Sequence, residues 1–285
     1  MRIAVVVLHY ENLTDTTECL ESLAKYLQDK QNQIDIVVVD NGSVNEKAAE
    51  LKERFPDQRI HFINSESNLG FARGNNIGFQ YAKHTLQSEI IVLANNDLIF
   101  EQNEFFDRAA EVVVKQRLDI AGPRIISMVD KKNQNPVPYS YPNLSSVNER
   151  IIKYEILRVL CYFGLDICAQ SAFSKRHTAD FENDVYQLHG ACLILANRYV
   201  KNYEGLYPGT FMYMEEDILK FISKKDKLNM KYLDDIEVFH KEGSSTEKLY
   251  GAGKKKRLFF YKWSLDSCKQ LKHLMKSEDI DAVNR

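Results

Sequence analysis

Cysteine is scarce in this 285-residue sequence, and its spacing excludes two kinds of small stabilised fold. The five cysteines, at positions 19, 161, 168, 192 and 268, are odd in number and form no Cys-X-X-Cys pair. A zinc ribbon needs such pairs, and a disulfide framework needs an even set. We therefore expect reduced thiols in a cytoplasmic protein with a large buried core.

Glycine, proline and long apolar runs are also sparse. Gly plus Pro amounts to 18 residues, while 44% of the residues are apolar and 27% are charged. This composition is globular and excludes collagen, coiled coil and long disorder. The first apolar run, residues 3–8, is too short for a signal-peptide core, and no stretch approaches the roughly 18 to 20 apolar residues that span a bilayer. We expect a protein that is soluble or at most peripheral to a membrane.

The charge balance gives no general attraction to nucleic acid, because 38 basic residues face 40 acidic ones. Residues 254–276 differ, with eight Lys or Arg, one Asp, and aromatic residues at 259, 260, 261 and 263. Such a stretch can lie on an anionic membrane surface. It can equally be a solvated helix whose aromatic face packs on the domain. No nucleic-acid-binding module accompanies it, so we expect no nucleic-acid partner.

The first hundred residues alternate between strand and helix patterns. Residues 3–8, 36–39 and 90–94 are short β-branched runs that are apolar on both faces, as in strands buried in a parallel sheet. Helical patterns cover 14–27, 46–55 and 71–84, and a weaker strand covers 59–63. With right-handed crossovers, this order predicts an open, doubly wound α/β sheet.

The pattern is less regular after about residue 120. We expect a proline-rich loop over 130–146, an amphipathic helix over 151–168, strand character over 186–196, and a helix within 205–222 after a Gly/Pro turn.

Polar residues follow each of the three main strand runs. They are His9, Tyr10, Glu11 and Asn12 after the first, Asp40, Asn41, Gly42 and Ser43 after the second, and Asn95, Asn96 and Asp97 after the third. Turns are rich in such residues anyway. Because ligands bind beyond the carboxyl ends of parallel strands, three polar clusters at one edge favour a binding site.

These residue types suit a nucleotide whose base and diphosphate are held by separate strand ends. Asp40 can accept from a pyrimidine N3–H, Tyr10 offers an aromatic face, and Arg73 can pair with base or phosphate oxygens. Asp97 is an oxygen ligand suited to a divalent cation. Structural alternatives are packing for Tyr10, a surface charge for Arg73 and a helix N-cap for Asp97. The glycines at 70, 74 and 78 match neither a Rossmann nor a P-loop spacing.

Seven ordered motifs carry a family resemblance: VVVLHYEN (5–12), VVVDNGS (37–43), NLGFARGNN (68–76), LANND (93–97), HGACLIL (189–195), FMYMEEDIL (211–219) and VFHKEGSS (238–245). The set resembles family 2 inverting glycosyltransferases with a GT-A fold, especially rhamnosyltransferase-like members. The resemblance implies a Rossmann-like, mostly parallel central sheet flanked by helices. It further implies one domain over 1–250, with a nucleotide-sugar half (1–120) and an acceptor half (121–250), before a basic aromatic helical extension (251–285).

The implied activity is transfer of a sugar, with inversion, from a UDP- or dTDP-sugar to a hydroxyl of a glycan or lipid-linked acceptor in bacterial cell-surface polysaccharide synthesis. Mg²⁺ or Mn²⁺ is the implied cofactor, and the implied location is cytoplasmic or peripheral on the inner face of the membrane. A non-catalytic nucleotide-sugar-binding partner of another transferase is the alternative. A nucleotidyltransferase would need a Gly-rich loop after the first strand, which is missing.

The resemblance also assigns roles. Asp40 would contact the base, Asp97 would close an Asp-X-Asp-type motif that here reads Asn-Asn-Asp, and His240 would be a second ligand to the metal or diphosphate. An inverting transfer needs one general base, for which we choose Glu216, with Glu215 and Asp217 as competitors. An acidic helix N-terminus would explain these three carboxylates without catalysis.

The complete expected site has three groups. The nucleotide-sugar group is His9, Tyr10, Asn12, Asp40, Gly42, Ser43, Asn68, Gly70, Arg73, Asn76, Asn95, Asn96 and Asp97. The acceptor or diphosphate group is His189, Gly190, Ala191, Ser244 and Ser245, and the metal ligands are Asp97 and His240.

Overall fold

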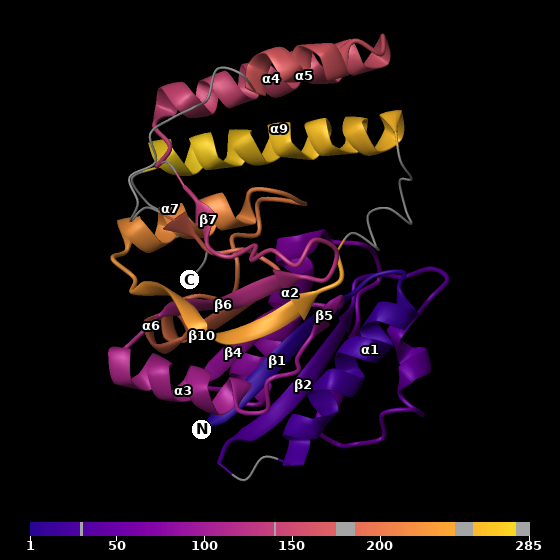
Figure 1. Ribbon diagram of the computed structural model, residues 1–285, viewed down its shortest axis with the longest axis vertical. Helices are drawn as coiled ribbons and strands as arrows, with labels where there is room; N and C mark the ends of the chain where they lie inside the picture. The colour runs from indigo at the N-terminus through magenta and orange to yellow at the C-terminus, as the bar shows by residue number, and fades with distance from the viewer. Residues whose placement is uncertain (29–30, 140, 175–185, 243–252, 278–285) are drawn as a thin grey trace.

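The structure is a computed structural model that describes residues 1–28, 31–139, 141–174, 186–242 and 253–277 (Figure 1). Side chains of residues 171–174 are not described. Among the described residues, no helix is both long and apolar enough to cross a bilayer.

A central eight-stranded sheet runs in the order β3-β2-β1-β4-β9-β6-β10-β5. Its strands are β1 (Arg2–His9), β2 (Gln33–Asp40), β3 (Ile60–Asn64), β4 (Ile90–Asn95), β5 (Leu98–Ile99), β6 (Ile120–Ser127), β9 (Cys192–Ala196) and β10 (Met230–His240). A separate two-stranded ribbon joins β7 (Val137–Pro138) and β8 (Tyr186–Gln187).

Strands β1 to β4 are parallel and in a register that aligns their carboxyl ends. β1 lies between β2 and β4, and it pairs His9 with Asp40 on one side and Leu8 with Asn95 on the other. The later part of the chain adds β9 antiparallel to β4, and β10 parallel to β6. β5 runs antiparallel to β10 and pairs Leu98 with His240, so Asp97 lies next to the end of β10.

Helices cover both faces of the sheet and form an additional layer beyond it. They are α1 (Leu13–Ala24), α2 (Phe71–Gln80), α3 (Phe105–Gln116), α4 (Leu144–Tyr162), α5 (Asp166–Ser174), α6 (Asn197–Asn202), α7 (Glu215–Lys225) and α9 (Lys254–Lys276). Short turns of helix are η1 (Lys25–Gln28), η2 (Ala48–Leu51) and η3 (Tyr81–Thr85). In Figure 1, α4, α5 and α9 form the layer at the top of the view, away from β1 and β2.

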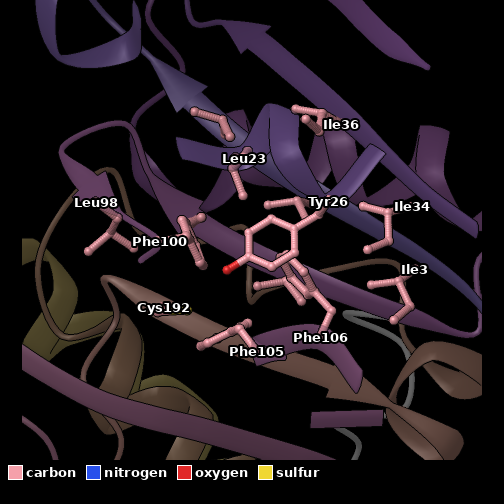
Figure 2. Close-up of a cluster of buried hydrophobic side chains, with 14 of the residues drawn as sticks. Ile3, Leu23, Tyr26, Ile34, Ile36, Leu98, Phe100, Phe105, Phe106 and Cys192 are labelled. Carbon is pink, nitrogen blue, oxygen red and sulfur yellow. The ribbon is translucent and has the colours of Figure 1, made fainter. Parts of the chain in front are cut away.

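Alternate residues of each strand supply two hydrophobic cores, one on each face. In β1, Ile3 packs in the core that α1 and α3 cover, while Ala4 packs in the core that α2, α7 and α9 cover. Figure 2 shows the first core, in which Tyr26 and Phe106 meet edge to face with ring centroids 4.8 Å apart. Burial on both faces is the reason that these strands read as continuous apolar runs.

The predicted α/β sheet is confirmed, and several predicted element bounds are wrong. The helix expected over 46–55 is present only as the short turn η2. The residues just before η2 instead form a loop, whose contacts are described in the next subsection. The helix expected over 151–168 begins earlier, at Leu144, and breaks at Gly164, where φ is +75°. The strand expected over 186–196 is split into β8 and β9. Asp97 is not the N-cap of the next helix, since α3 is preceded by Glu104.

The aromatic face of α9 packs on the domain, as one of the two alternatives for residues 254–276 predicts. Trp263 stacks on Phe211 with ring centroids 4.2 Å apart, and Phe260 meets Tyr213 at 4.9 Å. Tyr261 is almost fully buried. The lysines at 254, 255, 262, 269 and 276 are on the exposed side of the helix.

A buried ion pair joins α9 to α5. The Asp166 carboxylate has no exposed surface and accepts hydrogen bonds from Arg257 Nε at 2.6 Å and from Tyr261 Oη at 3.0 Å. The hydrogen bonds from Arg257 outweigh burial and lower the pKa of Asp166. The helical layer is therefore attached by charge as well as by apolar contacts.

We predict that Asp166→Asn lowers the free energy of unfolding by about 2 kcal/mol, measured by urea denaturation at pH 7. Breaking a buried pair costs roughly 3–5 kcal/mol, and partial exposure of Arg257 reduces that. Because the folded-state pKa of Asp166 is lowered, its stabilisation is present above pH 3.8 and is lost as pH falls through the folded-state value. Asp130→Asn is the control, because the Asp130 carboxylate is exposed and pairs with Lys132, and it should lower stability far less than Asp166→Asn does; equal effects of the two substitutions would contradict the prediction.

Candidate active site

Most of the predicted polar residues of the nucleotide half meet at the carboxyl edge of the sheet, because the β1 register places their strand ends side by side. Tyr10 is half-buried at the end of β1. Asn12 caps α1, its side chain accepting from the Asp15 backbone N–H at 3.2 Å. Asn96 donates to Thr16 Oγ1 at 2.9 Å, and so fixes the turn after β4 against α1.

Glu11 organises the loop that follows β2, a role that the sequence analysis, which placed Glu11 in the first polar cluster, did not predict. Its carboxylate accepts from the backbone N–H groups of Val44, Asn45 and Glu46, at 2.5, 3.2 and 3.1 Å. Burial raises the pKa of Glu11, but these backbone hydrogen bonds outweigh burial and lower it. The signal was present in the first polar cluster, but a carboxylate that binds backbone cannot be distinguished by type from one that binds ligand.

His9 serves the same loop. Its ring has no exposed surface, with Nδ1 2.7 Å from Thr16 Oγ1 and Nε2 2.6 Å from the Glu46 carbonyl oxygen. In this structure His9 therefore holds the loop, and direct contact with a nucleotide stays a prediction.

Asp40 and its neighbours lie at the end of β2, on the carboxyl edge of the sheet. The Asp40 carboxylate accepts from the backbone N–H groups of Ser43 at 2.8 Å and Ala48 at 2.9 Å. Gly42 has φ +78°, and a Cβ there would lie 2.3 Å from the Ser67 backbone, so only glycine fits. Ser43 Oγ accepts from the Glu11 N–H at 3.0 Å. The contact of Asp40 with a base stays a prediction, since each carboxylate oxygen has a further lone pair.

The NLGFARGNN motif connects the two halves. Asn76 exchanges two hydrogen bonds of 2.7 Å with the backbone of Leu206, and Arg73 Nε donates to the Pro208 carbonyl oxygen at 2.7 Å. Gly70 has φ +83°, and a Cβ there would lie 2.1 Å from the Phe211 carbonyl oxygen. Residues expected at the nucleotide thus hold the segment that leads to the acidic triplet.

Asn41, which the sequence analysis placed in the second polar cluster without assigning it a role, holds the start of that motif. Its side chain accepts from the Leu69 N–H at 3.0 Å and donates to the Gly70 carbonyl oxygen at 3.1 Å and to Asn68 Oδ1 at 3.2 Å. Asn68 Oδ1 also accepts from the Gly70 N–H. The two asparagines therefore set the approach of the motif to the sheet edge.

Asp97 and His240 are brought together from opposite halves of the chain. Both are buried, and His240 Nε2 lies 3.3 Å from Asp97 Oδ1. Gln134 Oε1 lies 2.8 Å from His240 Nδ1, which orients the ring. Lys241 reinforces the contact, since its backbone N–H donates to the Asp97 carbonyl oxygen and its ammonium pairs with Asp15.

This pair fits a divalent cation that also binds a diphosphate. Asp97 Oδ1 is buried without a hydrogen-bond partner, and His240 Nε2 faces it. Within the described ranges, no cluster of three or more His, Cys, Asp or Glu side chains could hold a metal by itself. Mg²⁺ is commonly bound by one or two carboxylates plus phosphates and water, so a small protein ligand set is adequate.

The HGA motif lies against this pair. The His189 ring meets the His240 ring with centroids 5.9 Å apart, and the Ala191 N–H donates to His189 Nδ1 at 3.1 Å. Burial, followed by the neighbouring His240, lowers the pKa of His189 to about 4, so the ring is neutral at pH 7. The Asn95 N–H donates to the Ala191 carbonyl oxygen at 2.9 Å, which joins the end of β4 to this motif.

The acidic triplet begins α7, and its three carboxylates differ in environment. Glu216 Oε1 accepts from the Gly190 N–H at 3.1 Å, and a Cβ at position 190 would lie 2.5 Å from that oxygen. Asp217 pairs with Arg150 of α4 at 3.0 Å. Glu215 is buried, and its Oε1 has no hydrogen-bond partner.

These environments separate the three groups chemically. Burial, with Glu216 beside it, raises the pKa of Glu215 to about 8, so Glu215 holds a proton at pH 7. Burial also raises the pKa of Glu216, while the hydrogen bond from Gly190 opposes that shift. The Asp217 carboxylate is held in its ion pair with Arg150. Glu216 is therefore the carboxylate best placed to accept a proton.

Ser244 and Ser245 lie outside the described residues. Three further residues that sequence reasoning missed are Gln134, Arg150 and Lys241, which act on site residues from distant segments. No spacing rule connects them to their partners, and only the fold does.

We predict that Glu11→Gln loosens the loop over residues 44–46. Replacing a carboxylate that accepts three backbone hydrogen bonds should cost about 1–2 kcal/mol at pH 7. Because the folded-state pKa of Glu11 is lowered, this contribution is present above pH 4.5 and is lost as pH falls through the folded-state value. Hydrogen exchange of the Val44 to Glu46 amides should quicken by tenfold or more.

Glu50→Gln provides the matched control, since the exposed Glu50 accepts from only one nearby backbone N–H, that of Lys47. Unchanged exchange in Glu11→Gln, or an equal change in Glu50→Gln, would show that Glu11 does not hold the loop.

Solved structures with this fold include the S. aureus protein TarS. The TarS structure matches with a TM-score of 0.58 at 15% identity, covering 99% of this chain and 41% of TarS. Structures of TarS residues 1–349 in complex with UDP and with UDP-GlcNAc each match with a TM-score of 0.55 at 14% and 15% identity, covering 99% of this chain and 68% and 69% of those chains. This likeness shows the GT-A fold.

Sequence comparison agrees with this fold and also identifies the family. The low-salt glycan biosynthesis hexosyltransferase Agl10 of Haloferax volcanii is 21% identical over 240 residues, which is 84% of this chain and 67% of that protein. The model of glycosyl transferase family 2 matches residues 4–179, more than half of the chain. The chain therefore belongs to glycosyl transferase family 2 and is a glycosyltransferase with a GT-A fold.

Proposed function

We propose that this enzyme transfers a sugar, with inversion, from a nucleoside-diphosphate sugar to a hydroxyl of a glycan or lipid-linked acceptor. One observation carries the proposal. The HGA motif connects a half-buried carboxylate with a raised pKa, Glu216, to the Asp97–His240 pair, through Gly190 and His189 respectively. A proton acceptor and a diphosphate-binding pair thus share one site.

Glu216 acts as the general base. It accepts the proton of the acceptor hydroxyl as that oxygen attacks the anomeric carbon from the face opposite the leaving diphosphate. Its raised pKa makes it a better proton acceptor than an ordinary glutamate, and the Gly190 N–H fixes its direction. The pair with Arg150 keeps Asp217 from competing.

Asp97 and His240 bind the diphosphate end of the donor together with Mg²⁺ or Mn²⁺. The cation, when bound, stabilises the negative charge that develops on the leaving diphosphate. Gln134 holds the His240 ring so that Nε2 faces Asp97, and Lys241 keeps the end of β10 against the turn that carries Asp97.

The nucleotide lies across the ends of β1 and β2, and Tyr10 and Asp40 contact the base. TarS has been solved with UDP and UDP-GlcNAc, which supports a UDP-sugar as the first donor to test, with dTDP-sugars next. The glycan-biosynthesis role in the name of Agl10 supports a glycan acceptor and a place in surface polysaccharide synthesis. The boundaries between the nucleotide-sugar half (1–120), the acceptor half (121–250) and the C-terminal extension (251–285) are part of this proposal.

The first experiment is a donor screen. Purified protein with Mn²⁺ is incubated with UDP- and dTDP-sugars, and release of nucleoside diphosphate is measured beside thermal shift. The proposal is supported if one donor slowly releases nucleoside diphosphate without an acceptor and also raises the melting temperature of the protein. Stabilisation without any release or transfer would instead support a non-catalytic donor-binding partner.

We predict that Glu216→Gln lowers the rate constant for transfer by at least about a hundredfold, the usual contribution of a general base, while donor affinity stays within about twofold. Because the base works deprotonated and its pKa is raised, wild-type activity should fall as pH drops through a value above 4.5. Initial rates from pH 4 to 9 and donor titrations measure both effects.

Glu215→Gln separates the two neighbouring glutamates, because Glu215 is already neutral at pH 7 and the amide mimics it. Loss of activity in that variant, with activity retained in Glu216→Gln, would reassign the base. Glu53→Gln, on an exposed surface, is the control for expression and assay.

We predict that Asp97→Asn raises the Mn²⁺ concentration needed for half-maximal donor binding by about tenfold or more, because one anionic ligand is removed. Isothermal titration of donor at several Mn²⁺ concentrations measures this shift. Asp234→Asn, at an exposed position, is the control. A metal titration identical to wild type would remove Asp97 from the ligand set.

A further inference from the structure

Exposed apolar side chains are concentrated on one part of the helical layer. Among the described residues, fourteen large apolar side chains are strongly exposed, and eight of them lie between positions 144 and 167 on α4, α5 and the turn that joins them. Single exposed apolar residues need no explanation, but a cluster of this size marks an interaction surface.

Within the cluster, the most exposed apolar side chains lie in and beside the turn between α4 and α5. Phe163 is 75% exposed and Tyr162 is 62% exposed, and more than half of Leu165 and Ile167 is exposed as well. Gly164, with φ +75°, reverses the chain there, and no atom lies within 4 Å of the place of its Cβ. The turn therefore presents its side chains outward at a protruding position with open space around it.

This apolar turn is attached to the lysine-rich start of α9. Lys254 Nζ donates to the Tyr162 carbonyl oxygen at 2.9 Å and lies 5.8 Å from the centre of the Tyr162 ring. Arg257 pairs with Asp166, which neutralises the one carboxylate of the turn. Lys254 and Lys255 are exposed beside the apolar side chains.

We propose that the α4–α5 turn inserts Tyr162, Phe163, Leu165 and Ile167 into the interfacial region of an anionic lipid bilayer, with the lysines at the start of α9 on the head groups. Apolar and aromatic side chains beside Lys are the composition that binds such an interface. The aromatic residues of α9 are engaged in packing against residues 211–213 and α4, so the apolar contribution comes from the turn.

Charge distinguishes a bilayer from a second copy of the chain as the occupant. A two-fold interface brings the same patch of two subunits together, and would place the two lysine runs near each other. Lysine is also depleted in protein interfaces. An anionic surface instead attracts the same lysines, so the charges favour lipid.

The position of the turn relates this surface to the active site. Helix α4 carries Arg150, the partner of Asp217, and reaches the turn at Tyr162 about 18 Å farther along its axis. Docking through the turn would hold the catalytic carboxylates at a short, fixed separation from the bilayer, which suits the lipid-linked acceptor class. This consequence rests on the proposed function, whereas lipid binding does not.

The test is flotation of the full chain with vesicles of 30% phosphatidylglycerol in phosphatidylcholine, at 0.1 M and 0.5 M NaCl. We expect binding that falls by at least tenfold in the double variant Phe163→Ser, Leu165→Ser and by about threefold in Lys255→Glu, and that weakens in high salt. Both positions of the double variant are exposed, so folding, checked by thermal unfolding, should be retained. Tryptophan emission of Phe163→Trp should shift to the blue on binding, because the ring leaves water.

Two controls have the same chemistry elsewhere on the surface: the double variant Val44→Ser, Val129→Ser for exposed apolar side chains, and Lys52→Glu for charge. Equal binding by the Phe163 and Leu165 double variant and wild type, or no binding by wild type, overturns the proposal. A wild-type dimer in sedimentation that becomes monomeric in that variant also overturns it, by assigning the patch to a second copy. Nucleoside-diphosphate release without vesicles is measured separately, so failure of lipid binding leaves the transferase proposal standing.

Discussion

The parallel register of β1 between β2 and β4 is the constraint on which the rest of the molecule depends. It aligns three strand ends, so that the polar residues after them share one edge instead of three separate turns. The energetic basis is burial on both faces, which turns alternate residues of each strand into two separate cores. A slip of one residue would exchange the two faces and disrupt the complementary packing of both cores, and this packing therefore stabilises the position of the site.

Much of the polar chemistry at this edge is used to hold backbone. Glu11, His9 and Asp40 bind one loop, and Arg73 and Asn76 bind the segment before the acidic triplet. The backbone groups of these loops have no strand or helix partners. The side-chain contacts supply the hydrogen bonds that buried backbone N–H and C=O groups require. They also make the two halves of the chain one unit, because the NLGFARGNN motif positions the segment from which α7 begins.

Burial then distributes charge within the site. It keeps Glu215 protonated and His189 neutral at pH 7, and it raises the pKa of Glu216. A row of three adjacent acidic residues thereby becomes one neutral acid, one candidate base and one ion-paired carboxylate. The different roles follow from neighbours contributed by α4 and by the HGA motif, and they are not encoded in the triplet itself.

The sequence by itself determined the class of fold, the succession of strands and helices along the first hundred residues, and the family, because strand periodicity and ordered motifs are local properties of the chain. It also located Glu216, Asp97 and His240 as candidates by residue type and motif. Only the tertiary structure decided that Gln134 orients the His240 ring, that Arg150 forms an ion pair with Asp217, and that Glu11 holds a loop. It also decided that the aromatic face of α9 is packed on the domain while the α4–α5 turn is exposed. The physical reason is that hydrogen bonds, burial and ion pairing depend on which distant segments the sheet and helices bring within a few ångströms, and no local pattern contains that information.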